Sequence, residues 1–286
     1  MENSEGSPIN QIITTNDYAN KLYLSDFLRG TLIHSAIHEL KLPLGSRGLD
    51  AGCGIGSHVL LLAKVVRPAG HVTGLDLSPE LLNYAREIAQ MSGLSEDVSF
   101  QEGDVNNLPF DDNCFDWAWS SDCIGYAPAR QHTVRPHTAL KELIRVVKPG
   151  GSIIILMWSS QQLLPGYPRL EARLNATSQG IAPFATGMRP ELHFMRTLGV
   201  FQKVGLKYTE ARTFAGSIYA PLSDNVRNAL ISLFDMRWGE PQSELTQEDW
   251  VEYQRLCRPE SPDFILNLPD YYAFFTYSMF SGKVAR

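Results

Sequence analysis

Between residues 49 and 57 the chain reads Leu-Asp-Ala-Gly-Cys-Gly-Ile-Gly-Ser. Glycines at alternate positions let the backbone turn sharply and approach a ligand where any Cβ atom would collide. The residues before this loop predict a strand over 47–51, and those after it predict a helix over 57–66. A turn of this kind lies at the carboxyl edge of a parallel sheet, where ligands of open α/β folds bind. A tight strand-to-helix turn without a ligand is the structural alternative.

The alternation of strand and helix patterns continues on both sides of the loop. Strands are predicted at 71–77, 98–103, 115–120 and 151–158, and helices at 26–40, 79–91 and 138–147. The segment Pro149-Gly150-Gly151 is expected to end the last of these helices. Strands that alternate with helices predict an α/β fold, with a doubly wound and mostly parallel sheet.

Composition excludes several classes of protein. The chain has 286 residues, a formal net charge of −6 and a pI near 5.7, so a nucleic-acid partner is not expected. Four cysteines without a C-x-x-C pair predict reduced thiols, with neither a disulfide framework nor a metal site. No signal peptide and no membrane-spanning apolar run is visible, which favours a cytoplasmic protein. The sequence does not specify an oligomeric state.

Two acidic residues follow the next predicted strands. Asp76 lies at the end of the second strand, where a carboxylate can accept hydrogen bonds from both ribose hydroxyls of a nucleotide. Asp104 and Val105 follow the third strand and are placed to read an adenine edge. Each alone has a plainer explanation, because Asp76 could favour a helix N-terminus and Asp104 could be a turn residue.

Five motifs in order give the chain a family resemblance. They are Leu49 to Gly56, Gly74-Leu75-Asp76-Leu77-Ser78, Gly103-Asp104-Val105 with Leu108-Pro109-Phe110, Phe115-Asp116, and Leu143 to Gly151. In this order they resemble the class I S-adenosylmethionine-dependent methyltransferases, most closely the branch of ubiquinone/menaquinone C-methyltransferases and small-molecule methyltransferases. The resemblance covers about residues 45–158 and implies a seven-stranded Rossmann-like sheet.

The resemblance also implies which residues hold the cofactor, S-adenosylmethionine. Its methionine part is expected among Asp50, Gly52, Cys53, Gly54, Gly56 and Ser120, its ribose at Asp76, and its adenine at Leu77, Asp104 and Val105. Tyr18 and Arg29, in or before the first helix, are candidates to close over the methionine end, although surface or packing roles suit them equally well.

Candidate catalytic groups follow the fourth strand. Asp122 could act as a base or orient an acceptor, Tyr126 could line the pocket, and His132 could act as a general base. A solvated loop is the plainer reading of His132. The aromatic tail beyond residue 158 either fills the core or forms the walls of an acceptor pocket suited to a planar, lipidic or amine substrate.

These observations predict methyl transfer to a small-molecule acceptor that is aromatic, quinone-like or an amine. An NAD(P)-dependent oxidoreductase is the alternative, but Ser57 stands where that fingerprint needs its third glycine. A non-catalytic cofactor-binding protein and an arsenite-type enzyme using Cys53, Cys114 and Cys123 are further alternatives.

The chain divides in prediction into an N-terminal tail and helix (1–44), a cofactor-binding core (45–158), and a remainder (159–286) that completes the sheet. In this remainder, helices are predicted at 191–204, 223–238 and 246–256, and strands at 206–214 and 271–284. Segments 159–190 and 222–268 are expected to form a helical lid over the acceptor pocket.

Overall fold

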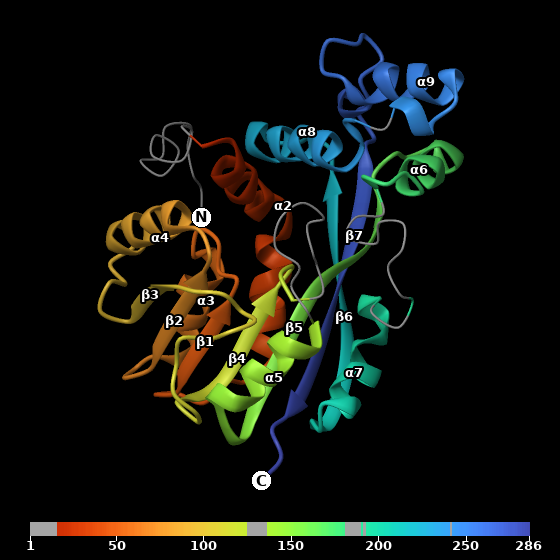
Figure 1. Ribbon diagram of the computed structural model, residues 1–286. Helices are drawn as coiled ribbons and strands as arrows, with labels where there is room; N and C mark the ends of the chain where they lie inside the picture. The colour runs from red at the N-terminus through yellow and green to blue at the C-terminus, as the bar shows by residue number, and fades with distance from the viewer. Residues whose placement is uncertain (1–15, 125–135, 181–189, 191–192, 241) are drawn as a thin grey trace.

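A seven-stranded sheet with the strand order β3-β2-β1-β4-β5-β7-β6 forms the centre of the molecule (Figure 1). The computed structural model describes residues 16–124, 136–180, 190, 193–240 and 242–286. The strands are β1 (Arg47–Ala51), β2 (His71–Asp76), β3 (Val98–Glu102), β4 (Phe115–Ser121), β5 (Val147–Gln162), β6 (Lys207–Tyr219) and β7 (Tyr272–Lys283). Neighbouring strands from β3 through β2, β1 and β4 to β5 pair in parallel. Strand β7 pairs antiparallel with both β5 and β6. The predicted fold class is confirmed.

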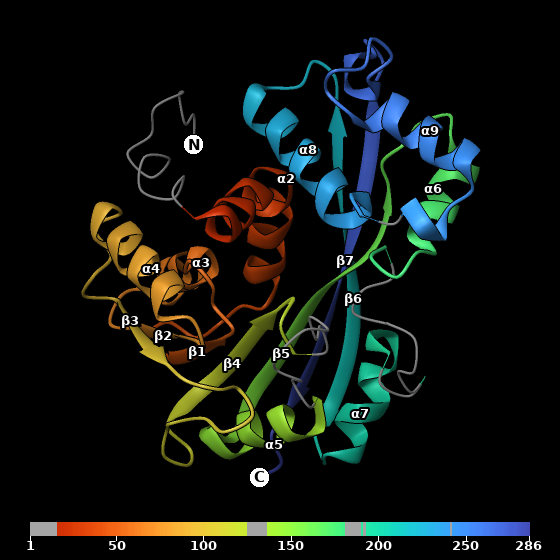
Figure 2. The same ribbon diagram turned by 45° about the horizontal axis from the view of Figure 1, so that its top comes forward.

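Helices cover both faces of this sheet (Figure 2). They are α2 (Asp17–Glu39), α3 (Ser57–Val66), α4 (Pro79–Met91), α5 (Pro136–Val146), α6 (Pro168–Asn175), α7 (Thr197–Lys203), α8 (Asp224–Trp238) and α9 (Gln247–Cys257). Buried side chains of β4 alternate between the faces, because Trp117 and Trp119 join the core under α2 and α3 whereas Ala118 joins the core under α5. None of the helices that the structure describes is long and apolar enough to cross a membrane.

The first described helix begins earlier than the predicted residue 26. Helix α2 begins at Asp17, because the Asn16 side chain accepts a hydrogen bond from the Ala19 amide at 2.8 Å and so caps the helix. The additional turns bring Leu22 over the glycine loop, where its Cδ1 lies 3.1 Å from the position of a Cβ atom on Gly54. The N-terminal half of α2 therefore lies beside the predicted ligand site.

The Pro149-Gly150-Gly151 segment is not the interruption that the sequence predicts. Helix α5 ends at Val146, and β5 begins at Val147. The segment is accommodated as an irregularity, since Phe115 pairs with Val147 and Trp117 already pairs with Ser152. Gly150, with φ +84°, supplies the left-handed backbone that this irregularity needs.

The predicted helix 191–204 begins later than expected. Its described part is a 3-10 turn, Phe194–Arg196, followed directly by α7. His193 starts this turn, because its side chain accepts a hydrogen bond from the Met195 amide at 3.3 Å. Residues 191 and 192 lie outside the described residues.

Strands β5 and β6 are longer than predicted, whereas β7 has nearly its predicted length, and the extended strands position three helices. Strand β6 continues to Tyr219 and β5 to Gln162, past the carboxyl ends of the parallel strands. Helices α6, α8 and α9 therefore lie beyond that edge of the sheet, in the upper part of Figure 1. This is the side on which the glycine loop opens.

Candidate functional site

The glycine loop between β1 and α3 has a backbone that other residues adopt only under strain. Gly52, Gly54 and Gly56 have φ values of +84°, +54° and +81°. A Cβ atom on Gly52 would lie 2.3 Å from the Cys123 sulfur, and one on Gly56 would lie 3.0 Å from Ala85. Gly52 therefore allows the loop to approach the end of β4, and Gly56 allows α4 to pack closely.

Asp50 is a buried carboxylate. Its side chain is 1% exposed, and neither carboxylate oxygen has a hydrogen-bond partner among the residues that the structure describes. Burial, with a smaller contribution from the charge of Asp76, raises the pKa of Asp50 to about 8. A buried polar group of this kind is costly unless a ligand satisfies it. The site thus fits a ligand that brings a cation or a hydrogen-bond donor to Asp50.

Asp76 presents its carboxylate at the end of β2. One oxygen accepts a hydrogen bond from the Gly54 amide at 2.8 Å, and the other accepts one from the Ser78 amide at 3.0 Å. Each oxygen retains further acceptor capacity. Leu77 beside it is 45% exposed and leaves an apolar surface on which a planar group can pack.

Two other residues predicted to contact the cofactor, Asp104 and Ser120, have hydrogen-bond partners within the protein. Asp104 accepts hydrogen bonds at one oxygen from the backbone and side-chain nitrogens of Asn106, at 2.8 and 2.9 Å, and Val105 is buried. The fully buried hydroxyl of Ser120 donates to the Ala51 carbonyl at 2.8 Å. Ser120 thus joins the ends of β1 and β4, the point where the strand order reverses and ligands of such sheets bind.

Asp122, Arg29 and Tyr277 form one network where β4, α2 and β7 meet. One Asp122 oxygen accepts from the Tyr277 hydroxyl at 2.8 Å and pairs with the Arg29 guanidinium at 3.2 Å, and the other accepts from the Trp158 amide at 2.8 Å. Arg29 also pairs with Asp26 at 3.2 Å. Burial, and next the Asp122 charge, raise the pKa of Tyr277 above its usual range. Tyr277 therefore stays protonated and acts as a donor.

This network lies in the wall of a cavity of about 300 Å³. The cavity is bounded by α2, by the ends of β5 and β7, and by one face of α8. Its lining residues are Tyr18, Lys21, Leu22, Ser25, Leu28, Arg29, Asp122, Trp158, Ala229, Ser232, Leu233, Met236, Arg237 and Tyr277. The structure thus brings together three residues predicted for the site, Tyr18, Arg29 and Asp122, and places α8 over them.

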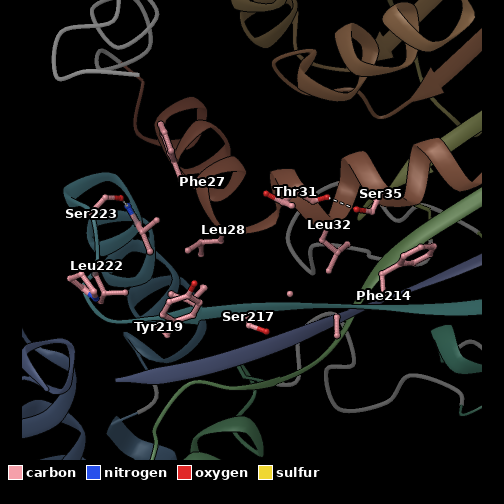
Figure 3. A pocket seen from close by; sticks show the side chains of 15 residues that line it. Phe27, Leu28, Thr31, Leu32, Ser35, Phe214, Ser217, Tyr219, Leu222 and Ser223 are labelled. Atoms are coloured by element: carbon pink, nitrogen blue, oxygen red, sulfur yellow. Dashed lines mark hydrogen bonds between the residues drawn. The ribbon is translucent and has the colours of Figure 1, made fainter. Parts of the chain in front are cut away.

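A second cavity, of about 550 Å³, lies on the other side of α2 (Figure 3). Leu28 lines both cavities, and Figure 3 shows Leu28 and Leu32 pointing from α2 toward β6. Among the described residues, no charged side chain and no predicted site residue lines this second cavity. The first cavity is therefore the one joined to the cofactor-binding candidates.

Two predicted catalytic residues, Tyr126 and His132, lie outside the described residues. The sequence placed Tyr277 and Trp158 only among the aromatic residues of the C-terminal part, and it did not identify Arg237 as a site residue. Only the position of Tyr277 in the β7 register, opposite Trp158 of β5, brings it to the site. No sequence pattern indicated a functional role for Arg237, because the polar face of α8 is typical of a solvent-exposed surface.

The thiols near the glycine loop are protonated. Burial raises the pKa of Cys123 to about 12 and places the pKa of Cys53 well above its usual value. Since the thiolate is the nucleophile and metal ligand, this environment does not favour the arsenite-type alternative.

A family model described as a methyltransferase domain matches residues 44–198. The chain belongs to this methyltransferase family. The resemblance to class I S-adenosylmethionine-dependent methyltransferases is thereby confirmed, and an NAD(P)-dependent oxidoreductase is not favoured.

A curated relative agrees with this membership, and two solved structures share the fold. A demethylmenaquinone methyltransferase of Staphylococcus aureus is 37% identical over 134 residues, which are 47% of this chain and 52% of the relative. The chain thus matches about half the length of this relative. The YcgJ protein of Bacillus subtilis has a TM-score of 0.57 at 18% identity, covering 90% of this chain and 99% of that one. Phosphoethanolamine N-methyltransferase 2 of Haemonchus contortus, in complex with S-adenosyl-L-methionine, has a TM-score of 0.55 at 16% identity, covering 99% and 61%.

Proposed function

We propose that the methyltransferase binds S-adenosylmethionine along the carboxyl ends of β1, β2 and β4 and transfers its methyl group to a small molecule held in the cavity under α8. The observation that carries this proposal is the unpartnered, buried carboxylate of Asp50 beside a loop of three left-handed glycines. Family membership and the name of the quinone-methylating relative support a small-molecule acceptor.

The site residues divide this task among them. Asp50 would hold the methionine ammonium group, Asp76 would accept from the ribose hydroxyls, and Leu77 would cover the adenine. Asp104 and Val105 would meet the adenine edge, while Gly52, Cys53, Gly54 and Gly56 would form the loop around the methionine part. When bound, the cofactor supplies a methyl group that its positively charged sulfur has already activated.

The chain must then orient the acceptor and exclude water, which by itself can lower a reaction barrier by about 7 kcal/mol. Asp122 is the candidate for orienting the acceptor, because Arg29, Tyr277 and the Trp158 amide fix its carboxylate at the cavity wall. Tyr18 and α8 would close the cavity, and segments 159–190 and 222–268 would act as the lid. In the same proposal, Tyr126 would line the acceptor pocket and His132 would act as a general base. Residues 45–158 would form the cofactor-binding core, and the protein would be cytoplasmic.

Calorimetric titration with S-adenosylmethionine, S-adenosylhomocysteine and NAD⁺ tests this function. We expect both sulfur ligands to bind the wild-type protein, NAD⁺ not to bind, and Asp76→Ala to weaken binding by about 100-fold, because two charge-assisted hydrogen bonds are lost. Asp112→Ala is the matched control, since Asp112 is an exposed carboxylate paired with Arg145 away from the site. Tighter binding of NAD⁺, or no binding of either sulfur ligand, would contradict the proposal.

A further inference from the structure

Arg237, in the last turn of α8, lines the cavity that contains the Asp122 network. Its guanidinium carbon lies 5.3 Å from the centre of the Trp158 ring, and its Nε atom is buried without a hydrogen-bond partner. The Nε1 atom of Trp158, which lines the same cavity, is also buried and unpartnered. Both atoms are donors that cannot accept a hydrogen bond. Two buried donors, in side chains that line one cavity, require an acceptor that none of the described residues supplies.

Stacking on the Phe275 ring fixes the position of Trp158, and Arg237 lies over the Trp158 ring. Phe275 stacks on Trp158 with a centroid distance of 4.7 Å and an interplanar angle of 12°. Trp158 is thus packed against Phe275 on β7 and has the Arg237 guanidinium over its ring. The arginine is therefore oriented before any ligand binds, which lowers the entropy that binding must overcome.

Two of the three cationic side chains that line the cavity form salt bridges with carboxylates. Arg29 is paired with Asp26 and Asp122, and Lys21 is paired with Asp17 at 2.8 Å. Arg237 has no carboxylate within salt-bridge distance among the residues that the structure describes. Among the described residues that line the cavity, Arg237 is therefore a cation whose charge no described carboxylate balances.

We propose that the methyl acceptor is an aromatic molecule with an oxyanion group, such as a carboxylate or sulfonate, that Arg237 and the Trp158 N–H bind together. Resting on the proposed function, this inference narrows the acceptor class. Arg237 is a specificity-determining residue at the α8 side of the cavity, whereas Asp122 lies at the sheet side. A neutral oxygen could satisfy the two donors but would leave the Arg237 charge unbalanced, and a cationic group would add a second positive charge beside it.

A matched series of ligands tests this inference: 2-naphthoate, 2-naphthol and 2-naphthylmethylammonium, titrated by calorimetry with and without S-adenosylhomocysteine. We expect 2-naphthoate to bind about 10-fold tighter than 2-naphthol, the value of one charge-assisted hydrogen bond, and the ammonium compound to bind most weakly. Arg237→Met should abolish the preference for the carboxylate, and Arg237→Lys should retain part of it.

Arg258→Met is the control, because Arg258 also lies over an aromatic ring, 5.4 Å from the centre of Tyr253, but does not line the cavity. It should leave the preference unchanged. Equal binding of naphthoate and naphthol, no binding of naphthoate, or a preference that survives Arg237→Met would overturn the inference. Titration of S-adenosylhomocysteine alone separates the two proposals. Failure of this ligand to bind contradicts the proposed function, whereas the naphthyl series measured in its absence still decides the role of Arg237.

Discussion

At the scale of single residues, the electrostatics of the site centre on Asp50. Burial raises its pKa to about 8, so the folded protein binds a proton there far more tightly than the unfolded chain does. The favourable contribution of this proton is complete below pH 4 and is lost as the pH rises from about 4 to 8. The ligand-free protein therefore tolerates Asp50 at a cost that grows with pH.

Replacement of Asp50 should reveal this cost. We expect Asp50→Asn to raise the free energy of unfolding of the ligand-free protein by roughly 2–5 kcal/mol at pH 8, and to change it little at pH 4, because the amide never ionises. Urea unfolding at the two pH values measures the difference. A variant that is no more stable than wild type at pH 8 would show that Asp50 is not a strained group.

Arg29 should have a larger structural effect than an exposed arginine. Its side chain is 13% exposed and pairs with both Asp26 and Asp122. Arg29→Met leaves the half-buried Asp122 carboxylate short of a partner, so we expect a loss of about 2–3 kcal/mol in urea unfolding. Arg212→Met, which removes exposed pairs with Glu39 and Glu210, should lose less than 1 kcal/mol. Equal losses for the two variants would refute the buried network.

At the scale of elements, the glycine loop is the part of the candidate site whose conformation the sequence predicts most directly. Loop geometry is local, because three glycines, a preceding strand and a following helix specify it without reference to distant residues. The acidic residues after β2 and β3 follow in the same way from the order of strands. The acceptor cavity depends instead on registers between residues more than a hundred positions apart, such as Trp158 opposite Tyr277, which no local pattern encodes.

The loop also makes a testable distinction between two left-handed glycines. Gly52→Ala would place a Cβ atom 2.3 Å from the Cys123 sulfur at φ +84°. We expect a loss of at least about 2 kcal/mol in unfolding free energy and the loss of S-adenosylhomocysteine binding.

Gly93 provides the matched control for this substitution. It has φ +65°, and a Cβ atom there would meet nothing within 4 Å. Gly93→Ala should therefore lose only about 1 kcal/mol and should bind the ligand normally. Similar behaviour of the two variants in urea unfolding and calorimetry would mean that the close approach of the loop to Cys123 has no consequence.

At the scale of the whole molecule, extension of the sheet brings α8 to the cavity beside the proposed cofactor site. Strands β5, β6 and β7 continue past the carboxyl ends of the parallel strands, and α8 packs from there onto α2 (Figure 2). Among the described residues of segments 159–190 and 222–268, only those of α8 line the cavity, while α6 contacts α8 and α9 contacts α6. Helical patterns in the sequence predicted α8 and α9 but not α6, and the place of these helices follows from the lengths of β5 and β6, which were underestimated.

In the proposed complex, the methionine ammonium group of the cofactor satisfies the buried carboxylate of Asp50. The most direct test is calorimetric measurement of S-adenosylhomocysteine affinity at pH 6 and pH 8 in the wild-type protein and Asp50→Asn. The ammonium group favours ionised Asp50, so below its pKa of about 8 binding must displace a proton. We predict that affinity rises by at least about 10-fold from pH 6 to pH 8 in the wild-type protein and stays constant in Asp50→Asn. Methylthioadenosine, which lacks the amino-acid portion, should show no such dependence. An affinity that is independent of pH in the wild-type protein, or equally dependent in Asp50→Asn, would contradict the account.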